Sequence, residues 1–262
     1  MSNLSLAVRD SSTMLRRNLL HARRYPSLTL NLLLTPVMLL LLFVYVFGDA
    51  MSAGIGGGGD RSDYVSYLVP GLLLMTIGST TIGTAVSVSY DMTEGIIARF
   101  RTMAIHRGSV LVGHVIGSVV QSIMSVVLVG AVGVAIGFRS TDATALEWLA
   151  AFGLLLLFTL ALTWIAVGMG LISPNAEAAS NNALPLIFLP LISSAFVPID
   201  SMPGWFQPIA EYQPFTPAIE TLRGLLLGTG IGHNGWLALG WCLALTALGY
   251  VWATSKFNSD PN

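Results

Sequence analysis

The residues best suited to interact with a partner lie in one charged stretch, 91–107, which reads DMTEGIIARFRTMAIHR between two long apolar segments. Its charged or titratable residues are Asp91, Glu94, Arg99, Arg101, His106 and Arg107. The acids come first and the arginines later, an order that complements a helix dipole. Ile96, Ile97 and Phe100 recur at helical spacing, which predicts a short amphipathic helix. Such a helix could dock into a groove on another protein; the alternative is a solvated loop with positive charges at a membrane surface.

The sequence contains no motif for nucleotide hydrolysis. A P-loop needs a lysine that reaches the phosphates, and the only lysine is Lys256. The four histidines are scattered without the spacing of paired metal ligands, and the single cysteine excludes a multi-cysteine metal site. We therefore expect no catalytic residue, no bound metal and no cofactor on this chain, and any use of ATP would require a partner.

The composition is that of an integral membrane protein. Hydrophobic residues make up 54% of the 262 positions and charged residues 10%, with a mean hydropathy of +0.74; a soluble domain has about a quarter charged residues. A helix that crosses the ~30 Å hydrocarbon core needs ~20 apolar residues. Six stretches satisfy this requirement: 28–48, 64–90, 109–137, 148–172, 180–198 and 236–254. The sequence predicts an all-α fold with six transmembrane helices in one domain, 1–262; five helices are the alternative, because Pro185 and Pro190 interrupt the fifth stretch.

Basic residues predict the orientation. With both termini on the same side, that side receives nine of the twelve lysines and arginines. Cytoplasmic segments accumulate lysine and arginine, so both termini and the stretch 91–107 are expected in the cytoplasm. Arg9, Arg16 and Arg23 recur at seven-residue intervals in 1–25, which favours an amphipathic helix in the membrane interface over a solvated tail.

The stretch 198–230 would then lie on the outer side. It has too many prolines to span a membrane, yet it carries an aromatic group typical of interfaces. We predict short re-entrant or interfacial helices here, including one that begins near Pro217 and carries a Glu220–Arg223 pair. The alternative is an ordinary external loop with aromatic anchors.

The centres of the predicted spans contain no Asp, Glu, Lys or Arg. This argues against proton coupling, which usually relies on ionisable residues within the membrane. The main polar exceptions are His114 and Gln121, which lie seven residues apart on one face of the third span. They could line a substrate pathway, or they could form hydrogen bonds between helices.

Two motifs resemble one protein family. The pattern Glu94-Gly95-x-x-x-Arg99-Phe100-Arg101 resembles the motif E-G-x-x-[DE]-R-[FL]-R/K-x-[LM]-P of ABC-transporter permeases of the second type (ABC-2), drug-exporter branch, and is similar to that of daunorubicin-resistance permeases. Ala98 and Ala104 depart from the usual acid and proline. The later sequence SSAFVPIDSMPGW, 193–205, followed by Pro214 and Leu222-Arg223, resembles the final periplasmic-side region of that family.

The resemblance implies a permease that dimerises in the inner membrane and binds two copies of a separate ATPase, which carries the ATP and magnesium. The N-terminal helix would contact the ATPase. The stretch 91–107 would be its coupling helix, through Glu94, Gly95, Arg99, Phe100 and Arg101. The helices of 198–230 would help close the outer exit, with a gate formed by Phe196, Pro198, Pro203, Trp205 and Phe206. The implied cargo is an amphipathic drug, antibiotic or lipid, which links the chain to antibiotic resistance.

Two other functions remain open at this point. The same scaffold could export a polysaccharide or a cell-wall precursor, or the chain could be a membrane anchor or assembly subunit that transports nothing. Membrane lipid is an expected partner and nucleic acid is not. The residues leave the substrate unnamed and allow a dimer of identical or of different chains.

Overall fold

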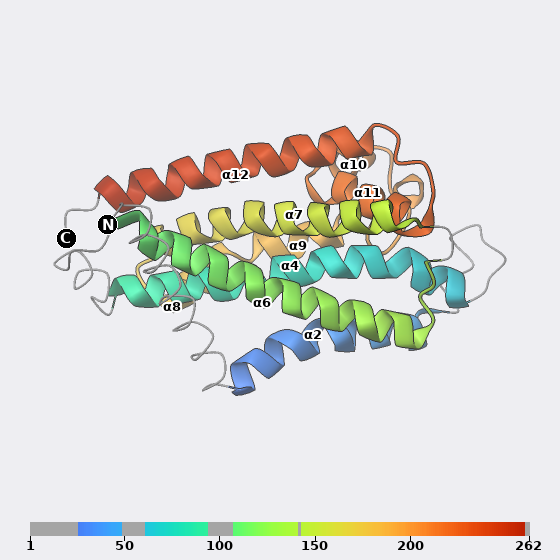
Figure 1. Cartoon of the computed structure of the whole chain (residues 1–262), viewed down its shortest axis with the longest axis horizontal. Helices are drawn as coiled ribbons and strands as arrows, with labels where there is room; N and C mark the ends of the chain where they lie inside the picture. The colour runs from blue at the N-terminus through green and yellow to red at the C-terminus, as the bar shows by residue number, and fades with distance from the viewer. Residues whose placement is uncertain (1–25, 49–60, 94–106, 141–142, 260–262) are drawn as a thin grey trace.

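The computed structural model describes residues 26–48, 61–93, 107–140 and 143–259, excluding the side chains of 26–33, 61 and 107–110 (Figure 1). The described parts are helical, without strands. The long helices are α2 (Pro26–Tyr45), α4 (Arg61–Thr93), α6 (Arg107–Ile136), α7 (Ala145–Ile172) and α12 (Asn234–Ser259). The short ones are α8 (Ala176–Asn182), α9 (Pro185–Leu191), the 3-10 helix η1 (Ile199–Ser201), α10 (Gln207–Tyr212) and α11 (Phe215–Leu227).

Four of these helices are long and apolar enough to cross a membrane. They are α4 over Ser62–Thr93, α6 over Leu111–Ile136, and the whole of α7 and α12. The shortest has 26 residues, about 39 Å at 1.5 Å per residue, which exceeds the ~30 Å hydrocarbon core. In α2 the part with described side chains is a shorter apolar helix, Leu34–Tyr45. Four of the predicted spans thus coincide with these four helices, and the predicted span 28–48 overlaps α2; six crossings stays a prediction.

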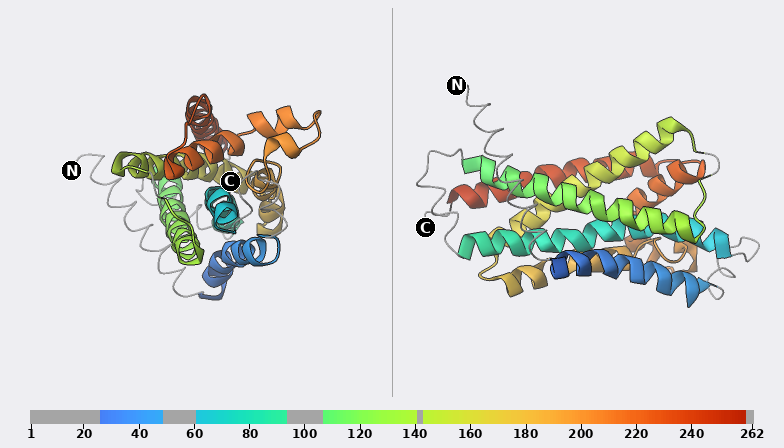
Figure 2. Two further views of the ribbon diagram at one scale, coloured as in Figure 1. Left: turned by 90° about the vertical axis from the view of Figure 1, so that its right-hand side faces the viewer. Right: turned by 60° about the horizontal axis from the view of Figure 1, so that its bottom comes forward.

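Helix α4 forms the centre of the bundle. The end-on view in Figure 2 shows α4 surrounded by the other long helices and by the chain of α8 and α9. Tyr64, Leu68, Leu72 and Ile77 of α4 are completely buried, and the helix packs against α2, α6, α7, α8, α9 and α11. The bundle has two ends. We call the end where α4 finishes and α6 starts the inner end, and the end with α10 and α11 the outer end (Figure 1).

Local sequence signals set the start of α7 and the end of α11. Thr144 and Glu147 form a capping box, in which the Thr144 side chain accepts the Glu147 N–H and the Glu147 carboxylate accepts the Thr144 N–H. Helix α11 stops at Gly228, whose left-handed backbone, with φ of 67°, suits a glycine. These signals fix where the chain turns at the outer end.

The fifth predicted span, 180–198, differs from the expectation of one continuous helix. The chain forms α8, a turn and α9, and then runs through further turns to Pro198. Pro185 and Pro190 explain the interruption, because proline lacks the N–H that an uninterrupted helix needs. Short helices therefore replace the single helix.

The chain from Ser173, which caps the end of α7, to Pro198 nevertheless runs the length of α4, and we call it the broken segment. The Ser89 hydroxyl of α4 donates to the Ser173 carbonyl at 3.4 Å, and the Tyr67 hydroxyl of α4 donates to the Ser194 carbonyl at 2.9 Å. The two positions on α4 are separated by 22 residues, about 33 Å at 1.5 Å per residue. That distance matches the hydrocarbon core, so the segment from Ser173 to Ser194 extends far enough to traverse it.

Glycines on α4 allow this close contact. A Cβ atom on Gly78 would collide with the carbonyl oxygen of Leu186, and one on Gly71 would lie 2.7 Å from the Cα of Ala195. Small residues at such contacts let two backbones approach in membrane proteins. The broken segment therefore lies against α4 backbone to backbone.

We predict that Gly78→Ala lowers the free energy of unfolding by roughly 1–3 kcal/mol, the usual cost of overpacking. The new methyl group meets a backbone carbonyl, which cannot rotate away. Thermal unfolding of the purified protein in detergent, followed by tryptophan fluorescence, measures the effect. Gly153→Ala on α7 is the matched control, because a Cβ there meets nothing within 4 Å. Equal unfolding midpoints for the two variants would contradict the close contact.

Candidate functional site

A buried arginine joins three elements at the outer end. Arg223 of α11 is 8% exposed. Its Nε and one terminal nitrogen donate to the Tyr67 carbonyl of α4, at 3.3 and 3.1 Å, and that same terminal nitrogen donates to the Ser194 carbonyl at 3.0 Å. Its other terminal nitrogen donates to Glu220 at 2.5 Å. The guanidinium also lies 3.7 Å from the ring centroid of Tyr67. Arg223 therefore ties α11 to α4 and to the end of the broken segment.

Helix α11 holds this arginine because most of its surface is buried. The predicted Glu220–Arg223 pair is confirmed, and the helix begins at Phe215, two residues before Pro217. Ile219 and Leu222 are fully buried, and the helix packs against α4, α7 and α12. A helix expected at the outer surface thus lies within the end of the bundle.

The Tyr67 carbonyl accepts Arg223 in the turn of α4 that precedes Pro70. Pro70 has no N–H, so the carbonyl of Ser66, four residues earlier and next to Tyr67, loses its helical donor. Backbone carbonyls near such a position need partners where water is scarce. Arg223 donates two hydrogen bonds to the Tyr67 carbonyl. The Ser194 carbonyl, in the turns after α9, accepts both Arg223 and the Tyr67 hydroxyl.

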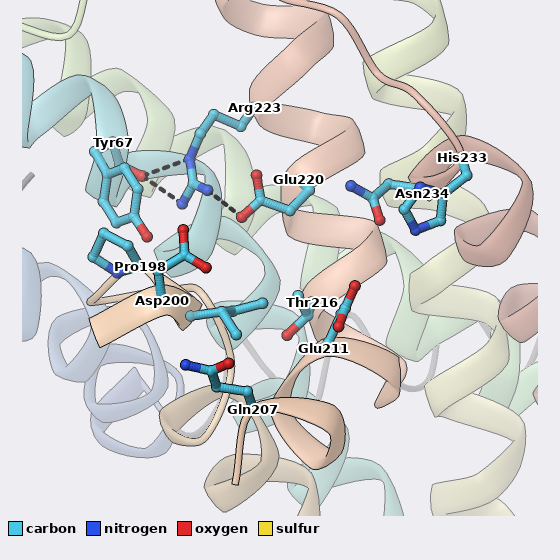
Figure 3. A pocket seen from close by; sticks show the side chains of 11 residues that line it. Tyr67, Pro198, Asp200, Gln207, Glu211, Thr216, Glu220, Arg223, His233 and Asn234 are labelled. Carbon is cyan, nitrogen blue, oxygen red and sulfur yellow. Dashed lines mark hydrogen bonds and ion pairs between the residues drawn. The ribbon is translucent and has the colours of Figure 1, made fainter. Parts of the chain in front are cut away.

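A pocket of about 430 Å³ lies beside this cluster. It is lined by Tyr67, Pro198, Ile199, Asp200, Gln207, Glu211, Thr216, Glu220, Arg223, His233 and Asn234. Figure 3 shows that these side chains come from α4, η1, α10, α11 and the start of α12. Three of the lining residues are carboxylates, which gives the pocket an acidic character.

A second buried polar contact lies at the inner end. His114 of α6 and Asp91 of α4 are 5% and 7% exposed, and the His114 Nε2 lies 3.0 Å from a carboxylate oxygen of Asp91. The sequence placed Asp91 in the charged stretch 91–107 outside the spans. The structure corrects this, because α4 continues to Thr93 and buries Asp91 in its last turn.

A row of hydroxyls extends this contact along α4 and α6. Thr84 and Ser118 share a hydrogen bond, and Thr80 and Ser122 share another at 2.7 Å. His114 thus takes the interhelical hydrogen-bonding role, one of its two predicted roles.

Gln121 is half-buried, and its carbonyl accepts the Ser125 hydroxyl at 3.0 Å. A pathway role for Gln121 stays a prediction.

The structure separates the residues of the predicted outer gate. Phe196 is buried against Phe43 of α2, with ring centroids 4.5 Å apart. Trp205 is 76% exposed and pairs with Phe206 at 5.4 Å. The remaining two differ as well, because Pro198 lines the pocket and Pro203 is exposed. These five residues do not form a single cluster here, and their gating role stays a prediction.

The predicted coupling residues Glu94, Gly95, Arg99, Phe100 and Arg101 lie outside the described residues, as does the predicted helix in 1–25. The structure does place the ends of the two helices that border the stretch 94–106.

Sequence reasoning missed Tyr67 and Ser194 as partners of Arg223. No local signal identified Tyr67, because the carbonyl that Pro70 deprives of its helical donor is that of Ser66.

Comparison with known proteins agrees with the resemblance. A family model described as ABC-2 type transporter matches residues 10–227. The daunorubicin resistance ABC transporter permease protein DrrB1 of Streptomyces coeruleorubidus is 28% identical over 227 residues, covering 85% of this chain and 77% of the relative. The probable doxorubicin resistance ABC transporter permease protein DrrC of Mycobacterium tuberculosis is 23% identical, covering 59% of this chain and 57% of the relative. Nodulation protein J of Rhizobium meliloti is also 23% identical, covering 73% of each chain.

We predict that Arg223→Lys lowers the free energy of unfolding by roughly 2–4 kcal/mol, because one ammonium group cannot reproduce the planar fork that reaches three acceptors. Thermal unfolding in detergent measures the loss. Arg139→Lys is the matched control, because Arg139 is exposed and donates to the carbonyls of Val134 and Phe138. If both substitutions shift the midpoint equally, the Arg223 cluster does not stabilise the outer end.

We predict that Asp91→Ala and His114→Ala are non-additive. After one partner is removed, losing the second costs less, so a double-mutant cycle gives an interaction free energy of roughly 1–3 kcal/mol. Unfolding in detergent of the wild type, both single variants and the double variant provides the four values. The control cycle combines Asp91→Ala with His233→Ala, since exposed His233 lies at the other end of the bundle. Additivity in the Asp91–His114 cycle would rule out a stabilising contact.

Proposed function

Because the chain belongs to the ABC-2 type transporter family, we propose that it is the membrane subunit of an ATP-driven exporter whose ATP is hydrolysed by a separate chain. The match over 10–227, together with permease relatives named for drug resistance, carries this proposal. The sequence supports it, because this multi-pass membrane protein has no P-loop lysine of its own.

The stretch 94–106 is the proposed contact with the ATPase. It connects α4, which ends at Thr93, to α6, which begins at Arg107. The Asp91–His114 contact joins these two helices close to that connection. A force applied to the stretch would therefore act on α4 and α6 together. The hydroxyl contacts Thr84–Ser118 and Thr80–Ser122 continue the connection toward the middle of the bundle.

In the proposed assembly, the inner end of the bundle and both termini of the chain face the cytoplasm. The excess of basic residues on the termini and on 94–106 supports this orientation. Two permease chains would bind two ATPase chains, which hold the ATP and magnesium. The proposed cargo is an amphipathic drug, antibiotic or lipid, moved outward; the names of two relatives, which refer to daunorubicin and doxorubicin resistance, support a drug.

We predict that the chain copurifies with an ATPase in equal amounts and that a transported drug stimulates the ATPase of the reconstituted complex. Glu94→Ala or Arg99→Ala should reduce the drug-stimulated rate roughly tenfold, the effect of losing about 1.4 kcal/mol of coupling, while the basal rate is kept. Stimulated and basal ATP hydrolysis in proteoliposomes provide the measurement.

The control for these variants is Arg139→Ala, which removes an exposed arginine at the outer end. Its stimulation should equal that of the wild type. Purification from the native membrane without any stoichiometric ATPase would overturn the exporter proposal. Full stimulation in both the Glu94 and the Arg99 variants would instead overturn only the role of 94–106 in coupling.

A further inference from the structure

We propose that the outer-end pocket is a binding site for an organic cation, meaning a positive centre such as a protonated or quaternary amine carried on an apolar body. The pocket has a volume of about 430 Å³ and receives side chains from five elements. The elements α10 and α11 that line it lie at the opposite end of the bundle from the end of α4 and the start of α6 (Figure 1). The proposal does not depend on the chain being an exporter, because binding needs neither ATP nor a partner.

The charge in the pocket is unbalanced. Asp200 of η1 and Glu211 of α10 line it and form no ion pair with any described residue. Figure 3 shows these two side chains entering from different elements, with Glu220 and Arg223 beside them. Arg223 does not neutralise them, because its guanidinium is already bonded to Glu220, Tyr67 and Ser194. His233 can contribute at most one positive charge, so the lining keeps a net negative charge.

The buried part of the wall is held in place before any ligand arrives. Thr216 is 1% exposed, and its hydroxyl donates to the Ala210 carbonyl and accepts the Gln213 amide at 3.2 Å. Gln207 donates to the Met202 carbonyl at 3.0 Å. Arg223 anchors Glu220. A preorganised wall loses little conformational entropy on binding, which favours a ligand site over a loosely packed surface hollow.

The chemistry of the lining selects an organic cation over a metal ion. Among the described residues, no three His, Cys, Asp or Glu side chains lie close enough together to hold a metal. Asp200 and Glu211 belong to separate elements, and Pro198, Ile199 and Tyr67 add apolar and aromatic surface to the same pocket. Separated carboxylates in a pocket that also has apolar lining suit a cation whose charge is spread over a bulky group. Ligand pockets commonly combine an apolar lining with a few charged groups in this way.

Two sources could supply such a cation at this end of a membrane protein. One is the ammonium headgroup of a lipid in the adjacent leaflet, and the other is a cationic amphiphile free in the membrane or in solution. Both present a positive centre at the membrane surface with apolar groups attached. The shared chemistry is what the pocket recognises, and the source can be separated by experiment.

The test uses radiolabelled tetraphenylphosphonium as the probe and the isosteric anion tetraphenylborate as its counterpart. The full-length purified protein in detergent should bind the cation saturably and bind the anion much more weakly. In the double variant Asp200→Asn/Glu211→Gln, the dissociation constant for tetraphenylphosphonium should rise roughly tenfold, a loss of two favourable charge contacts. Binding is measured by equilibrium dialysis against protein-free detergent.

Asp63→Asn is the matched control, because it removes an exposed carboxylate at the start of α4 that does not line the pocket. Its affinity for the cation should equal that of the wild type. The proposal is overturned if the cation shows no saturable binding, if the double variant binds like the wild type, or if Asp63→Asn weakens binding as much as the double variant does. Thermal unfolding of the double variant, expected to match the wild type, checks that the pocket is intact.

Lipid nanodiscs then separate the two sources. If a lipid headgroup occupies the pocket, phosphatidylethanolamine in a phosphatidylglycerol nanodisc should raise the apparent dissociation constant for tetraphenylphosphonium in the wild type, and this competition should vanish in the double variant. If the occupant is a free amphiphile, the two nanodisc compositions should give the same constant. Either result supports the site and assigns its source. Competition that persists in the double variant would place lipid and probe elsewhere and overturn the proposal.

Discussion

The need to provide hydrogen-bond partners for backbone carbonyls within a membrane bundle governs the outer end of this structure. Water is not available in the hydrocarbon core to bind such carbonyls, and the prolines of α4 and of the segment 180–198 reduce the number of backbone N–H donors nearby. Arg223 supplies several donors from one rigid group and uses them on the carbonyls of Tyr67 and Ser194. An arginine can be buried here because Glu220 pairs with it. Together with the buried apolar residues of α11, that one side chain helps to fix the position of the helix and the shape of the adjacent pocket.

Helix α4 links the two ends of the molecule through three different kinds of contact. At the outer end it is bonded to Arg223, and at the inner end Asp91 is bonded to His114. Between them, Gly71 and Gly78 bring the broken segment against its backbone. A close-packed interior resists continuous deformation, so a displacement at the inner end of α4 should move its neighbours with it. In the proposed exporter, α4 is the element through which work done at 94–106 would reach the outer end.

Hydropathy and helical spacing predicted most of the fold, because long apolar helices leave a strong signal in sequence. The Glu220–Arg223 pair was also predictable, since it is local to one helix. The contacts between Arg223 and Ser194, and between Asp91 and His114, could not be predicted, because each joins elements whose packing the sequence does not reveal. The charge pattern of 91–107 predicted an amphipathic helix that could dock to a partner, and the resemblance assigned it the coupling role. Neither indicates which surface the stretch contacts. The pocket was not predicted either, because its lining comes from five separate elements whose packing the sequence does not reveal.

The distribution of ionisable groups bears on where the energy for transport would enter. In the described parts of α4, α6, α7 and α12, the Asp, Glu, Lys, Arg and His residues lie toward the helix ends: Arg61, Asp63, Asp91, Arg107, His114, Glu147 and Lys256. Nearer the middle, the hydroxyls of Thr76 and Thr159 donate to carbonyls of their own helices, each at 2.7 Å. A proton relay needs titratable groups that continue across the membrane, and these helices do not provide such a series. Energy supplied at the inner end by a separate ATPase agrees with this arrangement, because it requires no charge to cross the bundle.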